Sequence, residues 1–517
     1  MSFSVKDIPT KPYEGQKPGT SGLRKRVKVF QQEHYTENFV QAIFDSIDAK
    51  DQTIVIGGDG RYFSPEAVQI ILKIGSANGV KRFIIGKDGI LSTPAASNII
   101  RKYKAYGGIL LTASHNPGGP NNDFGIKYNV SNGGPAPEGV TDKIYEKTKT
   151  ISSYKVLEAP EVDLSTIGET KYGPSEVAII DSVADYTILL EEIFDFPLIK
   201  EFLESHKDDF PILFDGLNGV TGPYARAIFV DTFGLPESSI QNCVPLPDFG
   251  GGHPDPNLTY AHTLVEKVEA DNIPFGAASD GDGDRNMIYG KGAFVTPSDS
   301  VAIIAHWADV IPYFKKGGVK GLARSMPTSK AIDLVAQKKG LEYFEVPTGW
   351  KFFGNLMDAG RLSICGEESF GTGSDHIREK DGLWAVVADY DYEEVPSDGA
   401  NALVKNLNDA LASGSLNETK HTAGKDNFVV SSIYNFEYKD PIDHSISKNQ
   451  GQVITFSDGS RVGATVRMYV ERYLPPSASP EELARPAAEG LQSLIDVALE
   501  ISKLKAYLGV DKPTVIT

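Results

Sequence analysis

The sequence predicts several α/β domains with mainly parallel sheets, followed by a smaller α+β domain. Three apolar runs each end in a loop rich in glycine and aspartate, and helical patterns lie between these runs. Strands that alternate with helices are typical of parallel sheets, which bind ligands at the carboxyl ends of their strands. The last part of the chain instead alternates polar and apolar residues and then continues as an amphipathic helix. The three runs with their loops are residues 54–60, 212–219 and 276–284; the C-terminal strands are expected at 428–438 and 453–470, and the helix from about Pro480.

The length of the chain sets the number of domains. At about 150 residues per domain, 517 residues correspond to three or four domains. Changes in the alternation of strand and helix patterns place domain boundaries near residues 190, 295 and 395. Within the first domain, a helix is expected to begin with Ser64 as N-cap and Pro65 in the first turn, and to end near Gly75.

Composition excludes several classes of protein. A net charge of −18 argues against a protein that binds nucleic acid or an anionic membrane. Two cysteines, Cys243 and Cys365, form neither a disulfide framework nor a zinc cluster. The first 15 residues have no apolar core of a signal peptide, and no run of about 18 apolar residues occurs. We therefore expect a cytoplasmic protein without nucleic-acid or membrane partners. Separately from this composition, we expect a monomer whose partners are small molecules.

The most informative segment is Thr-Ala-Ser-His-Asn-Pro at residues 112–117. It follows the apolar run 108–111, so a strand is expected to end there in a small polar loop. Ser114 would then be exposed at a strand end, where it could carry a phosphoryl group. Pro117 and the glycines at 118–119 fix a turn behind it. Taken alone, the segment is also compatible with a plain surface turn.

A second segment alternates three aspartates with glycines. Glycine allows the backbone to curl, so the carboxylates of Asp280, Asp282 and Asp284 can converge on a hard cation such as Mg²⁺. An EF-hand is excluded, because its sixth and twelfth positions would be Arg285 and Lys291 instead of Gly and Glu. A solvated acidic turn is the alternative, but three like charges this close require a cation. Arg285 could reach a phosphate on that metal.

Two further loops carry polar groups. Residues 17–26 (Lys-Pro-Gly-Thr-Ser-Gly-Leu-Arg-Lys-Arg) are a candidate anion site or a basic strand. Residues 366–371 (Gly-Glu-Glu-Ser-Phe-Gly) follow the apolar run 362–365 and suit sugar hydroxyls. The two glutamates do not form a glycosidase pair, because adjacent side chains of an extended segment point in opposite directions. His376 and Lys380 could transfer a proton or bind phosphate.

Together these segments resemble the α-D-phosphohexomutase superfamily, and the eukaryotic phosphoglucomutases most closely. The resemblance covers most of the chain. It implies three α/β domains of similar topology with mixed, mainly parallel sheets, and a smaller α+β C-terminal domain, around a central cleft. It also implies interconversion of glucose 1-phosphate and glucose 6-phosphate through glucose 1,6-bisphosphate. The matching segments are residues 17–24, 112–119, 123–129, 280–285 and 366–376. The implied domains are 1–190 with the phosphoserine loop, 191–295 with the metal loop, 296–395 with the sugar loop, and 396–517.

The resemblance also implies a role for individual residues. Ser114 would be the phosphoserine, with His115 beside it, and Lys127 the candidate general base, with His376 as a second candidate. Mg²⁺ would be held by Ser114, Asp280, Asp282 and Asp284. Substrate contacts would come from Thr20, Ser21, Arg24, Arg285, Thr348, Glu367, Ser369, Lys380 and Arg467.

The chain departs from the family at two places. Near residues 461–463 a phosphate-binding loop of the form Arg-Leu-Ser-Gly-Thr-Gly is missing before the strand that follows. Near residues 387–389 a helical segment that closes the third domain is missing, which would uncover apolar surface. Arg461, Ser460 and Arg467 could partly replace the lost loop. Two alternatives therefore stay open: a catalytically impaired phosphoprotein with a binding or scaffold role, and a mutase for another sugar phosphate.

Overall fold

The computed structural model of the chain divides into two compact units, each of which is described by itself. The first unit comprises Met1–Ala323, Ala331–Phe344 and Gly349–Val387, and the second comprises Arg324–Lys330, Glu345–Thr348 and Ala388–Thr517. The structure describes residues 3–19, 21–384, 390–391, 418–423, 426–448, 452–457, 461–464, 468–472, 487–502 and 515–516.

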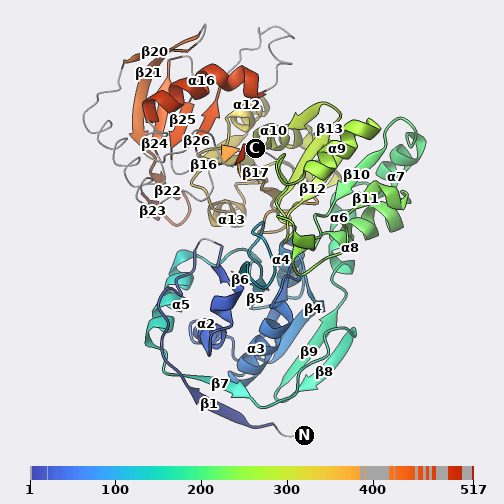
Figure 1. Ribbon diagram of the computed structural model, residues 1–517, viewed down its shortest axis with the longest axis vertical. Coiled ribbons are helices and arrows are strands. Elements are labelled where there is room, and N and C mark those ends of the chain that lie inside the picture. The colour runs from blue at the N-terminus through green and yellow to red at the C-terminus, as the bar shows by residue number, and fades with distance from the viewer. Residues whose placement is uncertain are drawn as a thin grey trace. The chain divides into compact units, whose positions relative to one another are not determined.

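The first part of the first unit is built on a seven-stranded sheet in the order β2-β6-β5-β3-β4-β9-β8. Figure 1 labels β4, β5, β6, β8 and β9 of this sheet. The central strands β5, β3, β4 and β9 pair in parallel, and β2, β6 and β8 add antiparallel edges. The strands are β2 (Leu23–Arg26), β3 (Thr53–Gly58), β4 (Arg82–Ile90), β5 (Gly107–Leu111), β6 (Asp123–Val130), β8 (Gly168–Tyr172) and β9 (Ser175–Ile180). A separate antiparallel pair joins β1 (Val5–Pro9) to β7 (Ser153–Leu157), and the helices are α1 (Val27–Phe30), α2 (Tyr35–Phe44), α3 (Ser64–Ala77), α4 (Thr93–Lys102) and α5 (Glu138–Thr150).

Both faces of this sheet are buried. The side chains of β3 alternate between the two faces and pack into a different apolar cluster on each. Ile54 and Ile56 pack into one apolar cluster with α2 and α3, whereas Val55 packs into a second cluster with α4. Successive side chains of a strand point to opposite faces, so one continuous apolar run supplies two cores. The carboxyl ends of β3 and β5, which pair in register, therefore emerge side by side from a fully covered sheet.

A five-stranded sheet follows in the order β11-β10-β12-β13-β14. The strand β10 pairs in parallel with β11 and β12, and β13 and β14 continue the sheet in antiparallel fashion. The strands are β10 (Ile212–Asp215), β11 (Ile240–Gln241), β12 (Phe275–Ser279), β13 (Asn286–Gly290) and β14 (Ala293–Val295). The helices are α6 (Ala184–Ile193), α7 (Phe196–Ser205), α8 (Gly222–Ala225), η1 (Arg226–Thr232), η2 (Glu237–Ser239), η3 (Phe249–Gly251) and α9 (His262–Asp271).

A four-stranded sheet comes next, in the order β16-β15-β17-β18, with β17 and β18 antiparallel. Its strands are β15 (Gly321–Ser325), β16 (Glu342–Val346), β17 (Ile364–Gly366) and β18 (Thr372–Ser374). Its helices are α10 (Pro297–Trp307), η4 (Ala308–Val310), α11 (Pro312–Gly317), α12 (Ala331–Lys339) and α13 (Lys351–Asp358).

The C-terminal part carries a five-stranded antiparallel sheet in the order β20-β21-β24-β25-β26, with the helix α16 packed on it. This is the α+β architecture that the sequence predicts. The elements are β20 (Lys420–Ala423), β21 (Asp426–Asn435), β24 (Gln452–Phe456), β25 (Arg461–Ala464), β26 (Met468–Glu471) and α16 (Ala487–Ser502), with the short pairs β19 (Tyr390–Asp391) with β27 (Val515–Ile516) and β22 (Tyr438–Lys439) with β23 (Ile446–Ser447).

The fold class is confirmed, with one local correction at α3. Phe63 occupies the N-cap position, and Ser64 is the first helical residue, whose buried hydroxyl has no hydrogen-bond partner among the described residues. The helix also continues through Gly75 to Ala77. A Cβ at Gly75 would meet the rings of Phe83 and Phe44 at 2.8 and 2.9 Å, so this glycine serves close packing and does not end the helix.

Across the described ranges, every helix is too short or too polar to span a bilayer.

Candidate active site

Ser114 lies three residues beyond the end of β5, in a strained backbone conformation. Its φ is +55°, in the left-handed region, which costs a residue other than glycine about 1–3 kcal/mol. Its backbone N–H donates to Thr112 Oγ1 at 2.7 Å. The sequence predicts an exposed serine, and this prediction is wrong: Ser114 is only 2% exposed. Two other loops pack over it, one from β3 and one from β12.

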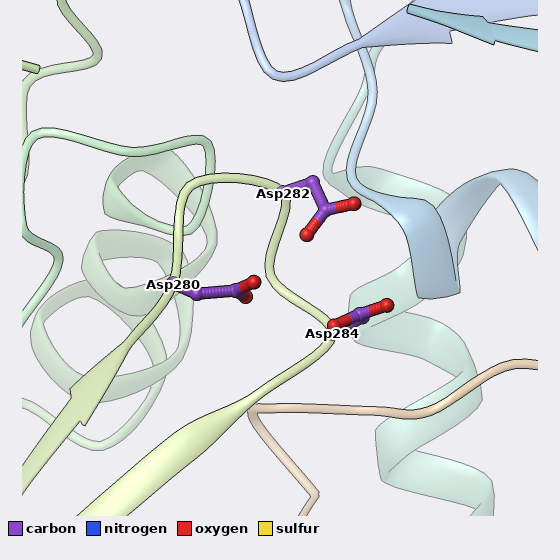
Figure 2. Close-up of side chains that lie close together, drawn as sticks. All are labelled: Asp280, Asp282 and Asp284. Carbon is purple, nitrogen blue, oxygen red and sulfur yellow. The ribbon is translucent and has the colours of Figure 1, made fainter. Parts of the chain in front are cut away.

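The loop from β12 to β13 brings three carboxylates together (Figure 2). Asp280, Asp282 and Asp284 are all buried, and each offers an oxygen within 4.8 Å of the others. Ser114 Oγ donates to Asp280 Oδ2 at 3.0 Å, which places the serine hydroxyl directly at this cluster. Thr93 Oγ1, in the first turn of α4, donates to Asp282 Oδ2 at 2.9 Å.

The cluster fits a divalent cation. Asp282 Oδ1 is buried and accepts no hydrogen bond within the described part of the chain, so it is available as a ligand. Burial, together with the charges of Asp282 and Asp284, raises the pKa of Asp280 well above its usual value. Such a group is costly to ionise unless a cation offsets the charge. Three hard oxygens in a small space are suited to Mg²⁺ or a similar ion, so these residues could hold a metal.

Cationic side chains surround the three carboxylates. Arg285 Nε lies 3.8 Å from Asp284 Oδ1, and its backbone N–H donates to Asp280 Oδ1 at 3.0 Å. Lys380 Nζ lies 3.7 Å from Asp284 Oδ2. Burial lowers the pKa of Lys380, but Asp284 and neighbouring glutamates more than offset this effect, so its pKa is raised. Lys380 is therefore held as a cation beside the cluster.

Arg24 approaches the same cluster from β2. Burial lowers the pKa of its guanidinium, and the charges of Asp282 and Asp284 oppose this shift. Its Nε is buried without a hydrogen-bond partner in the described residues. An unsatisfied buried donor next to carboxylates is suited to an anionic ligand.

The predicted sugar loop lies after β17. Glu367 Oε1 accepts the backbone N–H of Gly349 at 2.8 Å, and Glu367 Oε2 lies 3.7 Å from Lys380 Nζ. Ser369 is buried. A Cβ at Gly371 would meet the side chain of Lys380 at 2.1 Å, so this glycine lets Lys380 pass over the loop toward the aspartates.

The remaining predicted substrate contacts are Ser21, Thr348, Thr20 and Arg467. Ser21 is half-buried in the turn closed by the bridge between Gly19 and Gly22. Thr348 belongs to the second compact unit and is exposed. Thr20 and Arg467 lie outside the described residues. For all of these residues, and for Arg24, Arg285, Glu367, Ser369 and Lys380, contact with substrate stays a prediction.

Lys127, on β6, forms a buried ion pair with Glu379. Asn129 Nδ2 donates to the same oxygen, Glu379 Oε1, at 2.8 Å. Burial raises the pKa of Glu379, and Lys127 and Asn129 oppose that effect. The two side chains therefore balance each other's charge inside the protein.

This buried pair leads to a prediction about stability. Glu379→Gln leaves the ammonium group of Lys127 buried without a compensating carboxylate, so the free energy of unfolding should fall by about 3–5 kcal/mol. Thermal unfolding of wild type and Glu379→Gln measures the change. Equal unfolding temperatures for the two proteins would contradict the prediction.

His376 is held on both sides of its ring. Nδ1 lies 2.5 Å from Ser374 Oγ, and Nε2 lies 3.0 Å from Asp381 Oδ2. Tyr186 OH donates to the other oxygen of Asp381 at 2.5 Å. With both ring nitrogens engaged, the geometry favours a positioning role, and proton transfer by His376 stays a prediction. His115 is half-buried, with Nδ1 3.4 Å from Ser114 Oγ.

Three residues of this site were not predicted from the sequence. Thr93 contacts Asp282, Glu379 pairs with Lys127, and Arg61 donates to the backbone of the Ser114 loop. Each had a signal in the sequence. Thr93 follows a helix N-cap serine, Glu379 adjoins Lys380, and Arg61 directly follows the glycine-rich loop at the end of β3.

The chain is similar over its whole length to known phosphoglucomutases. It is 54% identical over 571 residues to the phosphoglucomutase of Aspergillus oryzae, with 100% of both chains covered. It is also 54% identical over 563 residues to the phosphoglucomutase of Schizosaccharomyces pombe, with 99% of this chain and 100% of that one covered. The first alignment extends over 571 positions, whereas this chain has 517 residues. The relative therefore has residues without a counterpart here, as the two departures from the family predict.

A solved structure points the same way. The open form of the exocytosis-sensitive phosphoprotein pp63/parafusin (phosphoglucomutase) from Paramecium has a TM-score of 0.87 and 43% identity, with 100% of both chains covered. Family descriptions match along the chain as phosphoglucomutase/phosphomannomutase α/β/α domain I at residues 15–155, domain II at 190–292, domain III at 297–390, and the phosphoglucomutase-1 C-terminal domain at 386–514. The chain belongs to the phosphoglucomutase/phosphomannomutase family.

Proposed function

We propose that the chain interconverts glucose 1-phosphate and glucose 6-phosphate, with Ser114 as the phosphoryl carrier and glucose 1,6-bisphosphate as the intermediate. The observation that carries the proposal is the 3.0 Å contact between Ser114 Oγ and Asp280, within a cluster of three buried carboxylates. The full-length relatives named phosphoglucomutase support the same reaction. The protein is accordingly an enzyme, an isomerase that acts by intramolecular phosphoryl transfer.

The reaction consists of two phosphoryl transfers with a reorientation between them. In the first, the bond between phosphorus and Ser114 Oγ breaks while a bond forms from phosphorus to the open hydroxyl of the sugar monophosphate. The proton of the sugar hydroxyl passes to a base, for which Lys127 is the first candidate and His376 the second. Ser114 Oγ takes up a proton and becomes an alcohol again. The bisphosphate then reorients in the site. The same steps run in reverse on its other phosphate, and that phosphoryl group passes to Ser114.

The acidic cluster supplies the metal site. Asp280, Asp282, Asp284 and a phosphoryl oxygen on Ser114 would hold Mg²⁺, which neutralises charge on the oxygens of the group in transfer. Arg285, Lys380 and Arg24 add positive charge around the same point. His115 lies beside Ser114 Oγ and would contact the phosphoryl group that Oγ carries.

The sugar and its second phosphate would be held by the remaining predicted contacts. Glu367 and Ser369 would accept and donate hydrogen bonds to sugar hydroxyls. Phosphate contacts would come from the loop that includes Thr20 and Ser21, from Thr348, and from Arg467 in the shortened C-terminal part. We retain the domain boundaries near residues 190, 295 and 395 and a monomeric state as proposals. A cytoplasmic location is also a proposal. Among the relatives, the phosphoglucomutases of Brassica napus and Arabidopsis thaliana are chloroplastic.

A coupled assay tests this function. Purified protein with Mg²⁺, glucose 1-phosphate and a trace of glucose 1,6-bisphosphate should produce glucose 6-phosphate at a rate that depends on the metal. A parallel panel with mannose 1-phosphate and ribose 1-phosphate measures the alternative of another sugar phosphate. The comparisons favour the enzyme over an impaired phosphoprotein, and a folded sample without turnover on any of these sugars would reverse that preference.

A further inference from the structure

We propose that Arg61 is the positioning residue of the phosphoryl carrier. Its guanidinium is fully buried, with 0% of the residue exposed, next to the loop of Ser114. The inference rests on the proposed function, because it concerns the serine that we assign as carrier. A buried ion pair between Arg61 and Asp59 fixes the backbone of Ser114 on both sides.

All three nitrogens of the guanidinium contact protein oxygens. Nη2 donates to the carbonyl of Ser114 at 2.7 Å, and Nη1 donates to the carbonyls of Asp123 at 3.0 Å and Asn116 at 3.3 Å. Nε donates to Asp59 at 2.9 Å, and Nη2 also lies 2.8 Å from Asp59 Oδ2. The guanidinium is therefore engaged with the protein and not with a phosphate or a sugar.

The carboxylate of Asp59 reaches the other side of the serine. Thr112 Oγ1 donates to Asp59 Oδ2 at 2.6 Å, and the same oxygen of Thr112 accepts the backbone N–H of Ser114 at 2.7 Å. The N–H of Ser114 is thus tied to Asp59 through Thr112, and its carbonyl is tied directly to Arg61. Both peptide groups that flank the Cα of Ser114 are anchored to one ion pair.

This anchoring explains how a serine keeps a left-handed backbone. Rotation about φ or ψ would move one of the two peptide groups away from its partner, so the φ of +55° persists. In that conformation Oγ points to Asp280. Arg61 therefore acts through Ser114 and does not bind substrate itself. Its loss is expected to lower kcat, because a reacting atom displaced by about 1 Å loses on the order of 10²-fold in rate, while KM stays nearly constant.

Arg61→Lys is the sharpest variant. Lysine keeps the charge beside Asp59, but its three donors radiate from one nitrogen and cannot reach three carbonyls and a carboxylate together. Val40→Ala, in the apolar core of the same sheet, is the matched control, because it lowers stability without touching the loop. Thr112→Val is a second variant of nearly the same shape that cuts only the link to the N–H of Ser114.

The experiment measures kcat, KM and the single-turnover rate at which glucose 1,6-bisphosphate phosphorylates Ser114, each on protein whose folding is checked by circular dichroism. For Arg61→Lys we expect kcat and the phosphorylation rate to fall about 10²-fold, while KM stays within about threefold of wild type. For Thr112→Val we expect kcat and the phosphorylation rate to fall about tenfold. For Val40→Ala we expect wild-type kcat, KM and phosphorylation rate. Equal rates for wild type and folded Arg61→Lys would overturn the proposal, and if Arg61→Lys does not fold, Thr112→Val decides in the same way. The proposed function fails separately, if wild type takes no phosphoryl group on Ser114.

Discussion

Replacement of Ser114 by alanine is expected to abolish both turnover and phosphoryl labelling of the protein. The hydroxyl is the only group that differs, and in our assignment its oxygen forms the covalent bond to phosphorus. Loss of a nucleophile typically lowers kcat by about 10⁵-fold or more, because no other group occupies its place in line with the reacting bond. Incubation with labelled glucose 1,6-bisphosphate, followed by peptide mass analysis, measures the label directly.

Two further variants separate chemistry from stability. Ser114→Gly also removes the hydroxyl, but glycine adopts a φ of +55° without strain, so this variant should be more stable than Ser114→Ala by about 1 kcal/mol. Ser238→Ala changes an exposed serine and should retain full labelling. Thermal unfolding of all three variants tests the order of stability. A Ser114→Ala protein that still accepts label would show that another residue is the carrier.

Much of the fold could be predicted because it depends on local patterns. The apolar runs at residues 54–56, 212–214 and 276–279 became β3, β10 and β12, and each ends in its glycine and aspartate loop as expected. The convergence of Asp280, Asp282 and Asp284 was also predictable, because five consecutive residues determine it. A pattern confined to one turn needs no knowledge of the rest of the fold.

The features that the sequence could not provide depend on distant contacts. Ser114 is buried because loops from β3 and β12 pack over it, and neither lies near it in the sequence. The ring of His376 is occupied partly through Asp381, which Tyr186 of α6 orients from nearly two hundred residues away. Gly75 reads as a helix end, yet it is required by two phenylalanine rings from other elements. In each case the deciding partner is fixed only by tertiary packing.

The second large effect is expected at the acidic cluster. Asp282→Asn replaces one of three carboxylates by a neutral amide, at a residue whose Oδ1 accepts no hydrogen bond within the described residues. The contribution of a metal to charge stabilisation in the transition state is several kcal/mol, so turnover in Mg²⁺ should fall by about 10³-fold. Mg²⁺ should raise the Tm of wild type, because it binds only the folded chain, and should no longer do so for Asp282→Asn. Asp271→Asn, an exposed aspartate at the end of α9, makes the same change in charge and should match wild type in both measurements.

In the absence of metal the effect on stability should have the opposite sign. Three buried carboxylates repel one another, and the pKa of Asp280 is raised by burial and by its two neighbours, so the metal-free fold is strained by its own charges. With EDTA present, Asp282→Asn should therefore unfold at a temperature equal to or above that of wild type, although it is nearly inactive. This reversal separates a metal site from a structural turn. If Asp282→Asn lowers the Tm equally with and without Mg²⁺, the carboxylate serves the loop and the cation is bound elsewhere.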